Sequence, residues 1–134
     1  MKTTNYFQTF IQVAEDCPAQ AAAVPPHKDP PSVAELQFRM VYDHPYTYTS
    51  DEVLFRIHAL RKNIPKGEQE AAQAVFFSKG QACFRASPLP KRYGWGVHYN
   101  EEGRMALYAV ETPEYRKLAQ DPALKQWKAM RNGK

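Results

Sequence analysis

The chain has little cysteine, little glycine and no long hydrophobic run. The 134 residues include two cysteines and six glycines. Two cysteines are too few for a disulfide-stapled secreted scaffold. The longest unbroken apolar run, Met105 to Val110, has six residues, whereas a membrane-spanning helix needs about 20. The N-terminus also lacks the apolar stretch of a signal peptide. We therefore expect a reduced, cytoplasmic protein with no membrane segment.

Several classes of enzyme site are also missing. The glycines form neither a phosphate-binding loop nor a Gly-x-Ser-x-Gly elbow, which argues against an NTPase or an α/β-hydrolase. No Cys-x-x-Cys or His-Glu-x-x-His occurs, and the four histidines are dispersed. We accordingly expect no metal and no cofactor. A hydrophobic content of 43% over this length predicts one compact domain, residues 1–134.

Acidic residues are absent from one long window. Between Lys79 and Asn100 there are four cations, Lys79, Arg85, Lys91 and Arg92, and no Asp or Glu. Residues 116–134 are basic as well, which we attribute to a solvated surface and to helix C-termini. Glutamates in residues 101–114 separate the two basic windows. This distribution favours a localised anion site over a continuous nucleic-acid-binding coat.

The first 80 residues predict one strand and three helices. Alternating apolar positions indicate a strand at 9–14, and five prolines make 18–31 an extended Pro/Ala-rich surface loop. A helix is expected from Ser32 to Tyr42 and another from Ser50 to about Arg61, each with acidic residues in its first turn. Residues 53–60 also contain strand formers, so a strand is the alternative there. A third helix is expected between Pro65 and Gly80.

The last 55 residues predict three strands and two helices. Alternation indicates strands at 82–87, 94–99 and 105–110, the last two joined by a hairpin loop with Gly103 in a left-handed conformation. Helices are expected to start at Thr112-Pro113 and at Asp121-Pro122, before a basic tail at 131–134. The predicted fold is α+β, with a three- to four-stranded, mainly antiparallel sheet covered by helices on one face.

Strand alternation also suggests a binding surface. It places Gly94, Gly96 and His98 on the face opposite Trp95, Val97 and Tyr99. If the strand at 82–87 pairs alongside, Arg85 and Ser87 border a flat glycine floor, and the stiff connector 87–93 brings further cations. We expect a small phosphate or carboxylate ligand, bound by Arg85, Ser87, Lys91, Arg92 and His98. The alternative is that the glycines accommodate a packed helix and that Arg85 pairs with a surface carboxylate.

Two other functions remain open. Aromatic residues interleaved with cations occur in nucleic-acid platforms, but Trp95 and Tyr99 are expected to face the core, which leaves weak, nonspecific binding. An enzyme using Cys17 as nucleophile would need an activating base such as His98. Carboxylates beside Cys17 disfavour the thiolate, and a lone cysteine is more often a small buried hydrophobe.

Several segments carry a family resemblance. They are Asn5–Pro18, Tyr48–Phe55, Phe76–Gly80 and Arg85–His98, the last containing the distinctive Lys-Arg-Tyr-Gly-Trp-Gly-Val-His sequence. In these segments the chain resembles a family of small bacterial proteins known as a domain of unknown function. The resemblance extends from about residue 5 to Arg131 and implies a complete single-domain protein. It implies no activity, ligand or oligomeric state.

Overall fold

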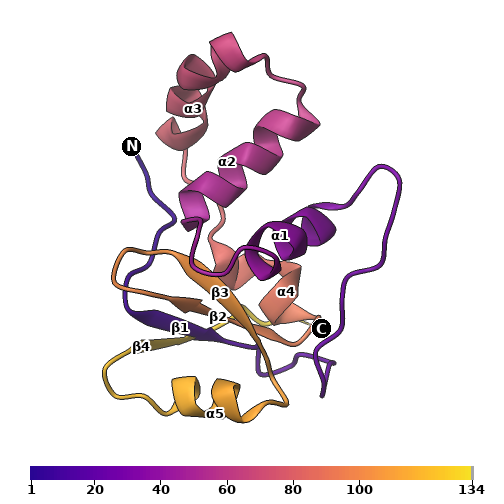
Figure 1. Cartoon of the computed structure of the whole chain (residues 1–134), viewed down its shortest axis with the longest axis vertical. Helices are drawn as coiled ribbons and strands as arrows, with labels where there is room; N and C mark the ends of the chain where they lie inside the picture. The colour runs from indigo at the N-terminus through magenta and orange to yellow at the C-terminus, as the bar shows by residue number, and fades with distance from the viewer. Residues whose placement is uncertain (134) are drawn as a thin grey trace.

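The computed structural model describes residues 1–133 and contains a four-stranded mixed sheet (Figure 1). The strands, in spatial order, are β3 (Met105–Ala109), β2 (Trp95–Tyr99), β1 (Thr9–Gln12) and β4 (Lys125–Lys128). β2 pairs antiparallel with both β1 and β3, whereas β4 runs parallel to β1. The α+β prediction with a mainly antiparallel sheet is confirmed.

Local capping explains where the helices begin. Ser32 accepts the Glu35 N–H at the start of α1 (Val33–Tyr42). Thr49 and Glu52 form a capping box at the start of α2 (Ser50–Arg61), which stabilises a helix rather than the alternative strand. The remaining helical elements are the 3₁₀ turns η1 (Lys66–Glu68) and η2 (Phe84–Ala86) and the helices α3 (Gln69–Ser78), α4 (Pro88–Lys91) and α5 (Pro113–Ala119).

Helices cover both faces of the sheet, not one face as predicted. On one side α1, α2 and α4 enclose the main core, where Phe38 packs against Trp95 with ring centroids 5.2 Å apart. On the other side lies α5 (Figure 1), whose Tyr115 packs edge-on against Phe10 of β1 at 5.0 Å. The predicted helix start at Thr112 is confirmed. This helix, α5, covers the sheet face for which no helix was predicted.

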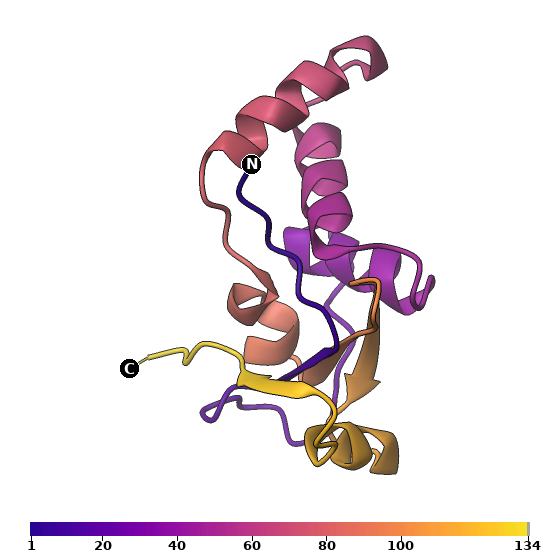
Figure 2. The same ribbon diagram turned by 90° about the vertical axis from the view of Figure 1, so that its left-hand side faces the viewer.

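The helices α2 and α3 form an arm that projects from the sheet (Figure 2). A small second core of Phe55, Ala59 and Phe77 joins them. α3 runs back toward the sheet, and the segment after it continues from its sheet-side end to η2 and α4 (Figure 2). This return path leaves a space between the base of the arm, α1 and α4.

The predicted strand at 82–87 is wrong. Its residues form the turn η2 and the cap of α4, because Ser87 accepts the Leu89 N–H and Pro88 occupies the first helical position. β2 has β1 and β3 as its neighbours, so no edge of β2 remains for this segment.

The predicted helix after Asp121 is wrong as well. Residues 125–128 instead form β4, which covers the outer edge of β1. The hydrogen bonds between residues 125–128 and β1 stabilise a strand there, despite the local helix-start signal at Asp121-Pro122. Of the predicted tail 131–134, residues 131–133 are outside helices and strands, and residue 134 lies outside the described residues.

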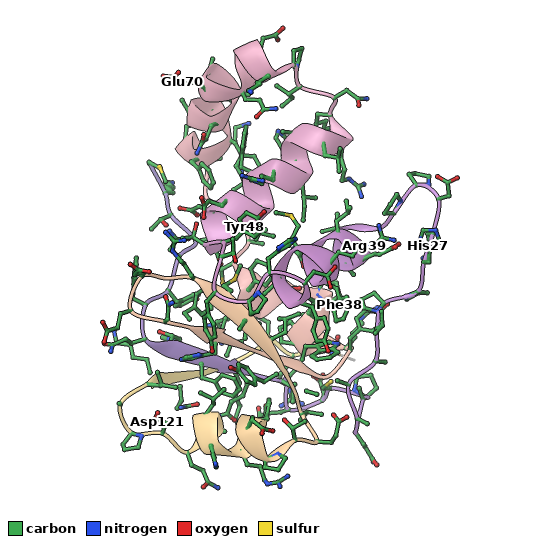
Figure 3. The ribbon with its side chains drawn as sticks, viewed as in Figure 1. His27, Phe38, Arg39, Tyr48, Glu70 and Asp121 are labelled. Atoms are coloured by element: carbon green, nitrogen blue, oxygen red, sulfur yellow. The ribbon has the colours of Figure 1, made fainter. Side chains whose placement is uncertain are left out.

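The loop at 18–31 contains no helix or strand, as predicted. The buried Glu35 carboxylate of α1 holds it in place by bonding His27 Nδ1 at 2.7 Å, the Lys28 N–H at 3.0 Å and Arg39. Figure 3 shows His27 and Arg39 facing each other beside α1. Among the helices of residues 1–133, none has the length and apolar content needed to cross a bilayer.

Candidate functional site

Arg85 and Ser87 make structural contacts on the α4 side of the sheet. The Arg85 Nε donates to the Lys128 carbonyl at 2.8 Å, and its guanidinium lies 4.8 Å from the centre of the Trp127 ring. The Ser87 hydroxyl donates to Gln37 Oε1 at 2.6 Å and accepts the Leu89 N–H at 3.1 Å. Ser87 is buried. Arg85 thus fastens the edge strand β4, and Ser87 caps α4.

Lys91 and Arg92 lie at the end of α4, next to the C-terminal segment. Asn132 Nδ2 donates to the Lys91 carbonyl at 2.9 Å, and the Arg92 Nε donates to Asn132 Oδ1 at 3.2 Å. The Met130 N–H bonds the Arg85 carbonyl in the same stretch. The structure therefore brings Arg85, Lys91 and Arg92 together along residues 127–132.

His98 lies on the opposite face of the sheet. Its register partner on β1 is Phe10, which packs against α5, whereas the neighbouring Val97 belongs to the main core. His98 Nδ1 lies 2.7 Å from the Tyr46 hydroxyl, which also bonds the Tyr108 hydroxyl at 2.7 Å. Burial lowers the pKa of His98 below its ordinary value of 6.5. His98 is thus separated by the sheet from the other four predicted site residues.

The glycine floor is occupied by protein. A Cβ on Gly96 would lie 2.6 Å from both Phe10 Cζ and Tyr115 Cε2, so Gly96 makes room for the side chain of a packed helix. Gly94 has a φ of +83° and lies against Ala19 and Ala22. The alternative interpretation of these glycines, accommodation of a helix, is confirmed at Gly96. The carboxylate partner expected for Arg85 under that alternative is instead the Lys128 carbonyl.

Cys17 and His98 do not form a catalytic pair in this structure. The Cys17 Sγ lies 3.9 Å from the Ala19 carbonyl, and within residues 1–133 no hydrogen bond joins it to His98. The thiol packs beside the main core. A thiol without a neighbouring base lacks the activation that nucleophilic catalysis requires.

A cleft of about 350 Å³ lies between the base of the arm, α1 and α4. Apolar atoms make up the larger part of its exposed lining, which comes from α1, α2, Lys62, α3 and the segment 81–88. The apolar lining residues are Val33, Leu54, Ile57, Phe76, Ala82, Ala86 and Pro88. The polar ones are Gln37, His58, Arg61, Lys62, Gln81, Cys83 and Ser87. No Asp or Glu is among these lining residues.

Gln37 supplies a free donor to this cleft. Its side chain is only 4% exposed, and its Oε1 accepts the Ser87 hydroxyl. Within residues 1–133 its Nε2 has no hydrogen-bond partner, yet no fully buried side-chain nitrogen or oxygen there is unsatisfied. The Nε2 must therefore reach open space, and the space that Gln37 lines is the cleft. The Ser87 hydroxyl orients the amide by donating to Oε1, and it also accepts the Leu89 N–H.

Cations stand at the α2 side of the cleft. Arg61 ends α2 and Lys62 follows it, and both are exposed. His58, one turn earlier, lies over the Phe76 ring with centroids 4.5 Å apart. Within the described residues, neither Arg61 nor Lys62 forms an ion pair. Their charge is therefore available to an anion that enters the cleft.

Cys83 forms part of the cleft wall. Its Sγ lies 3.3 Å from the Tyr6 hydroxyl. Burial, followed by this contact, raises the pKa of Tyr6 to about 12. Tyr6 therefore keeps its proton at neutral pH, and its hydroxyl can donate to the sulfur.

The sequence analysis missed most of this cleft. Of the five predicted site residues, Ser87 alone lines it. In the sequence, Arg61 and Lys62 are typical of the cations found at a helix C-terminus, and Gln37 is typical of a polar residue on a helix. Their proximity depends on the packing of α1 and α2 against the segment 82–88, and no motif in the sequence encodes that packing.

Comparison with known proteins identifies a family and no activity. No curated protein and no solved structure is significantly similar to the chain. The model of the Family of unknown function (DUF6157) matches residues 1–134. The chain therefore belongs to DUF6157.

Proposed function

For this member of DUF6157, a family without an assigned activity, we propose that the cleft binds a small carboxylate with an apolar tail. The observation that carries the proposal is the free Gln37 amide in a cleft without acidic residues. A donor that faces a cleft without a protein partner bonds water, or a ligand that displaces that water and accepts the same hydrogen bond. A carboxylate oxygen supplies such an acceptor.

The apolar walls account for the tail. Leu54, Ile57 and Phe76 offer aliphatic and aromatic surface from two helices of the arm. Burying each methylene group against such surface contributes about 0.8 kcal/mol. Mostly apolar walls with a few converging polar groups are typical of small-molecule sites. A small hydrophilic anion would leave these walls in contact with water.

The charge of the cleft selects the head group. Arg61 and Lys62 attract an anion, and no carboxylate of the lining repels it. Hydrogen bonds between charged partners are stronger than neutral ones. An alcohol of the same length would keep the tail contacts and lose this attraction, and an amine would be repelled.

Isothermal titration calorimetry with four probes tests the proposal. Octanoate has both the apolar tail and the negative charge. Acetate lacks the tail, octanol has the tail without a charge, and octylamine has the tail with a positive charge. We expect octanoate to bind at least tenfold more tightly than each of the other three. Equal affinity for octanoate and octanol, or no octanoate binding, would overturn the proposal.

Matched variants locate the binding. In Arg61→Gln/Lys62→Gln we expect octanoate affinity to fall roughly tenfold, and in Gln37→Leu by a similar factor. The control is Arg116→Gln/Lys117→Gln, which removes two exposed cations from the last turn of α5 on the other side of the sheet. The control should bind octanoate as the unmodified protein does. A comparable loss in the control would point to nonspecific attraction.

A further inference from the structure

Trp127 is an exposed aromatic residue on an edge strand. Its side chain is 44% exposed, whereas the other tryptophan, Trp95, is 7% exposed. In β4, Trp127 is the register partner of Ile11, so it lies on the α4 face of the sheet. Lys125, two residues earlier, lies on the same face. Trp127 thus places an indole at the surface beside a cation, unlike Trp95 and Tyr99, which the sequence predicts to face the core.

Arg85 holds this ring in place. Its guanidinium lies 4.8 Å from the ring centre, and its Nε is tied to the Lys128 carbonyl. This geometry holds the indole with the Arg85 guanidinium over one of its faces, so that a base can stack on the other face. Indole and guanidinium planes are the two kinds of side-chain surface on which nucleobases stack.

Cations outnumber carboxylates around Trp127. The cations on β4, after it, or bonded to this segment are Arg85, Lys91, Arg92, Lys125, Lys128 and Arg131, and the acids that contact the segment are Glu15 and Asp16. Glu15 lies 3.3 Å from Lys128 and 3.8 Å from Arg131, which uses part of their charge. Asp16 accepts the backbone N–H groups of Asn132 and Gly133, and the Asn132 bond chiefly holds its pKa below the ordinary value. Within residues 1–133, Arg85, Lys91, Arg92 and Lys125 form no ion pair.

We propose that this Trp127 surface, formed by Arg85, Lys91, Arg92, Lys125, Trp127 and Arg131, binds single-stranded nucleic acid. One base stacks on the indole, and the flanking phosphates contact the cations of α4 and β4. Single strands are favoured because a base must be unstacked to reach the ring. The short α4 offers no recognition helix for a duplex groove. This inference is independent of the ligand in the cleft.

Phosphate contacts and base stacking depend on salt concentration in different ways. Each phosphate neutralised on a single strand adds about −0.7 to the slope of log affinity against log salt concentration. Stacking adds affinity without releasing counterions. Removing the ring should therefore lower affinity at every salt concentration, whereas removing cations should also flatten the slope.

Fluorescence anisotropy with labelled oligothymidylate and oligouridylate, measured between 50 and 150 mM salt, tests the proposal. We expect Trp127→Ala to bind roughly tenfold more weakly with an unchanged slope. Lys91→Gln/Arg92→Gln should flatten the slope by about 1.4. Trp127→Phe keeps an aromatic ring and should retain part of the affinity, which separates stacking from a folding defect in Trp127→Ala.

Two controls complete the experiment. Arg116→Gln/Lys117→Gln and the cleft variant Arg61→Gln/Lys62→Gln should bind the oligonucleotides as the unmodified protein does.

Free thymidine monophosphate in excess should compete poorly, because it offers one base and one phosphate. The proposal is overturned if Trp127→Ala binds normally, if a duplex binds as tightly as the single strand, or if no binding occurs at 50 mM salt. Full displacement by the mononucleotide would also overturn it and would indicate a nucleotide site.

Discussion

Gly96 shows how one residue sets the distance between α5 and the sheet. A methyl group there would lie 2.6 Å from both Phe10 Cζ and Tyr115 Cε2. Both are ring atoms of buried side chains. In Gly96→Ala we expect the free energy of unfolding to fall by about 1–3 kcal/mol, as for other overpacked cores.

Urea unfolding checks the prediction for Gly96. Gly67→Ala is the matched control, because a Cβ at Gly67 meets nothing within 4 Å. The control should change stability by less than about 1 kcal/mol. Equal effects of the two substitutions would mean that α5 moves freely enough to accept the methyl group.

His98 gives a pH dependence whose sign is fixed by its lowered pKa. Burial is the main cause, and the charge of Asp121 partly opposes it. The unfolded chain binds the proton first as pH falls, so the contribution of His98 to stability is complete above about pH 6.5 and declines below it. The Tyr46 hydroxyl faces His98 Nδ1, and burial raises the pKa of Tyr46, so this hydroxyl stays protonated over this range.

We expect the free energy of unfolding to decrease between pH 7.5 and pH 5.5, and His98→Asn to lose part of that decrease. Urea unfolding of both proteins at three pH values measures the difference, and the other histidines cancel in the comparison. A stability difference between the two proteins that does not vary with pH would contradict the lowered pKa.

At the scale of elements, α2 depends on its capping box. The Thr49 hydroxyl accepts the Glu52 N–H, and the Glu52 side chain accepts the Thr49 N–H. Thr49→Ala removes the first bond and should cost about 1 kcal/mol. Thr47→Ala is the control, since the Thr47 hydroxyl makes a single 3.4 Å bond to the Pro45 carbonyl in an exposed loop. A similar cost for both substitutions in thermal unfolding would show that the cap adds nothing.

Elements with strong local signals could be predicted from the sequence. The Ser32 and Thr112 caps mark α1 and α5, and Gly103 with φ +77° closes the hairpin between β2 and β3. Residues 82–87 and 121–130 carried local signals of the same kinds, a strand alternation and the Asp121-Pro122 helix start, yet neither forms the predicted element. Their structure depends on which sheet edges remain open, and that is a property of the assembled sheet.

The identity of β4 changes how the C-terminal segment can be tested. Removing residues 125–134 would delete a strand paired with β1, together with Ala129, which is buried in the main core. A loss of binding after that deletion would report unfolding as readily as a lost contact. Substitutions of surface side chains outside the sheet, as in Lys91→Gln/Arg92→Gln, avoid this ambiguity.

At the scale of the whole molecule, the cleft depends on three segments far apart in the chain. Gln37 comes from α1, Arg61 from α2 and Ser87 from the cap of α4. Three cations of the acid-free window, Arg85, Lys91 and Arg92, lie along the C-terminal segment on the α4 side of the sheet, whereas His98 lies on the other face. A search for charged residues in the sequence passes over Gln37, because a neutral amide becomes informative only when the structure shows that its N–H groups lack a protein partner.

The most direct test of the cleft is a nuclear magnetic resonance titration of the ¹⁵N-labelled protein with octanoate. The proposal predicts that the Gln37 side-chain amide signals shift most, together with the backbone amides of residues 81–88 and of the last turn of α2. Signals of Trp127 and of residues 113–119 should stay in place. Shifts confined to the Trp127 surface, or an unmoved Gln37 amide at saturating octanoate, would contradict the proposed function.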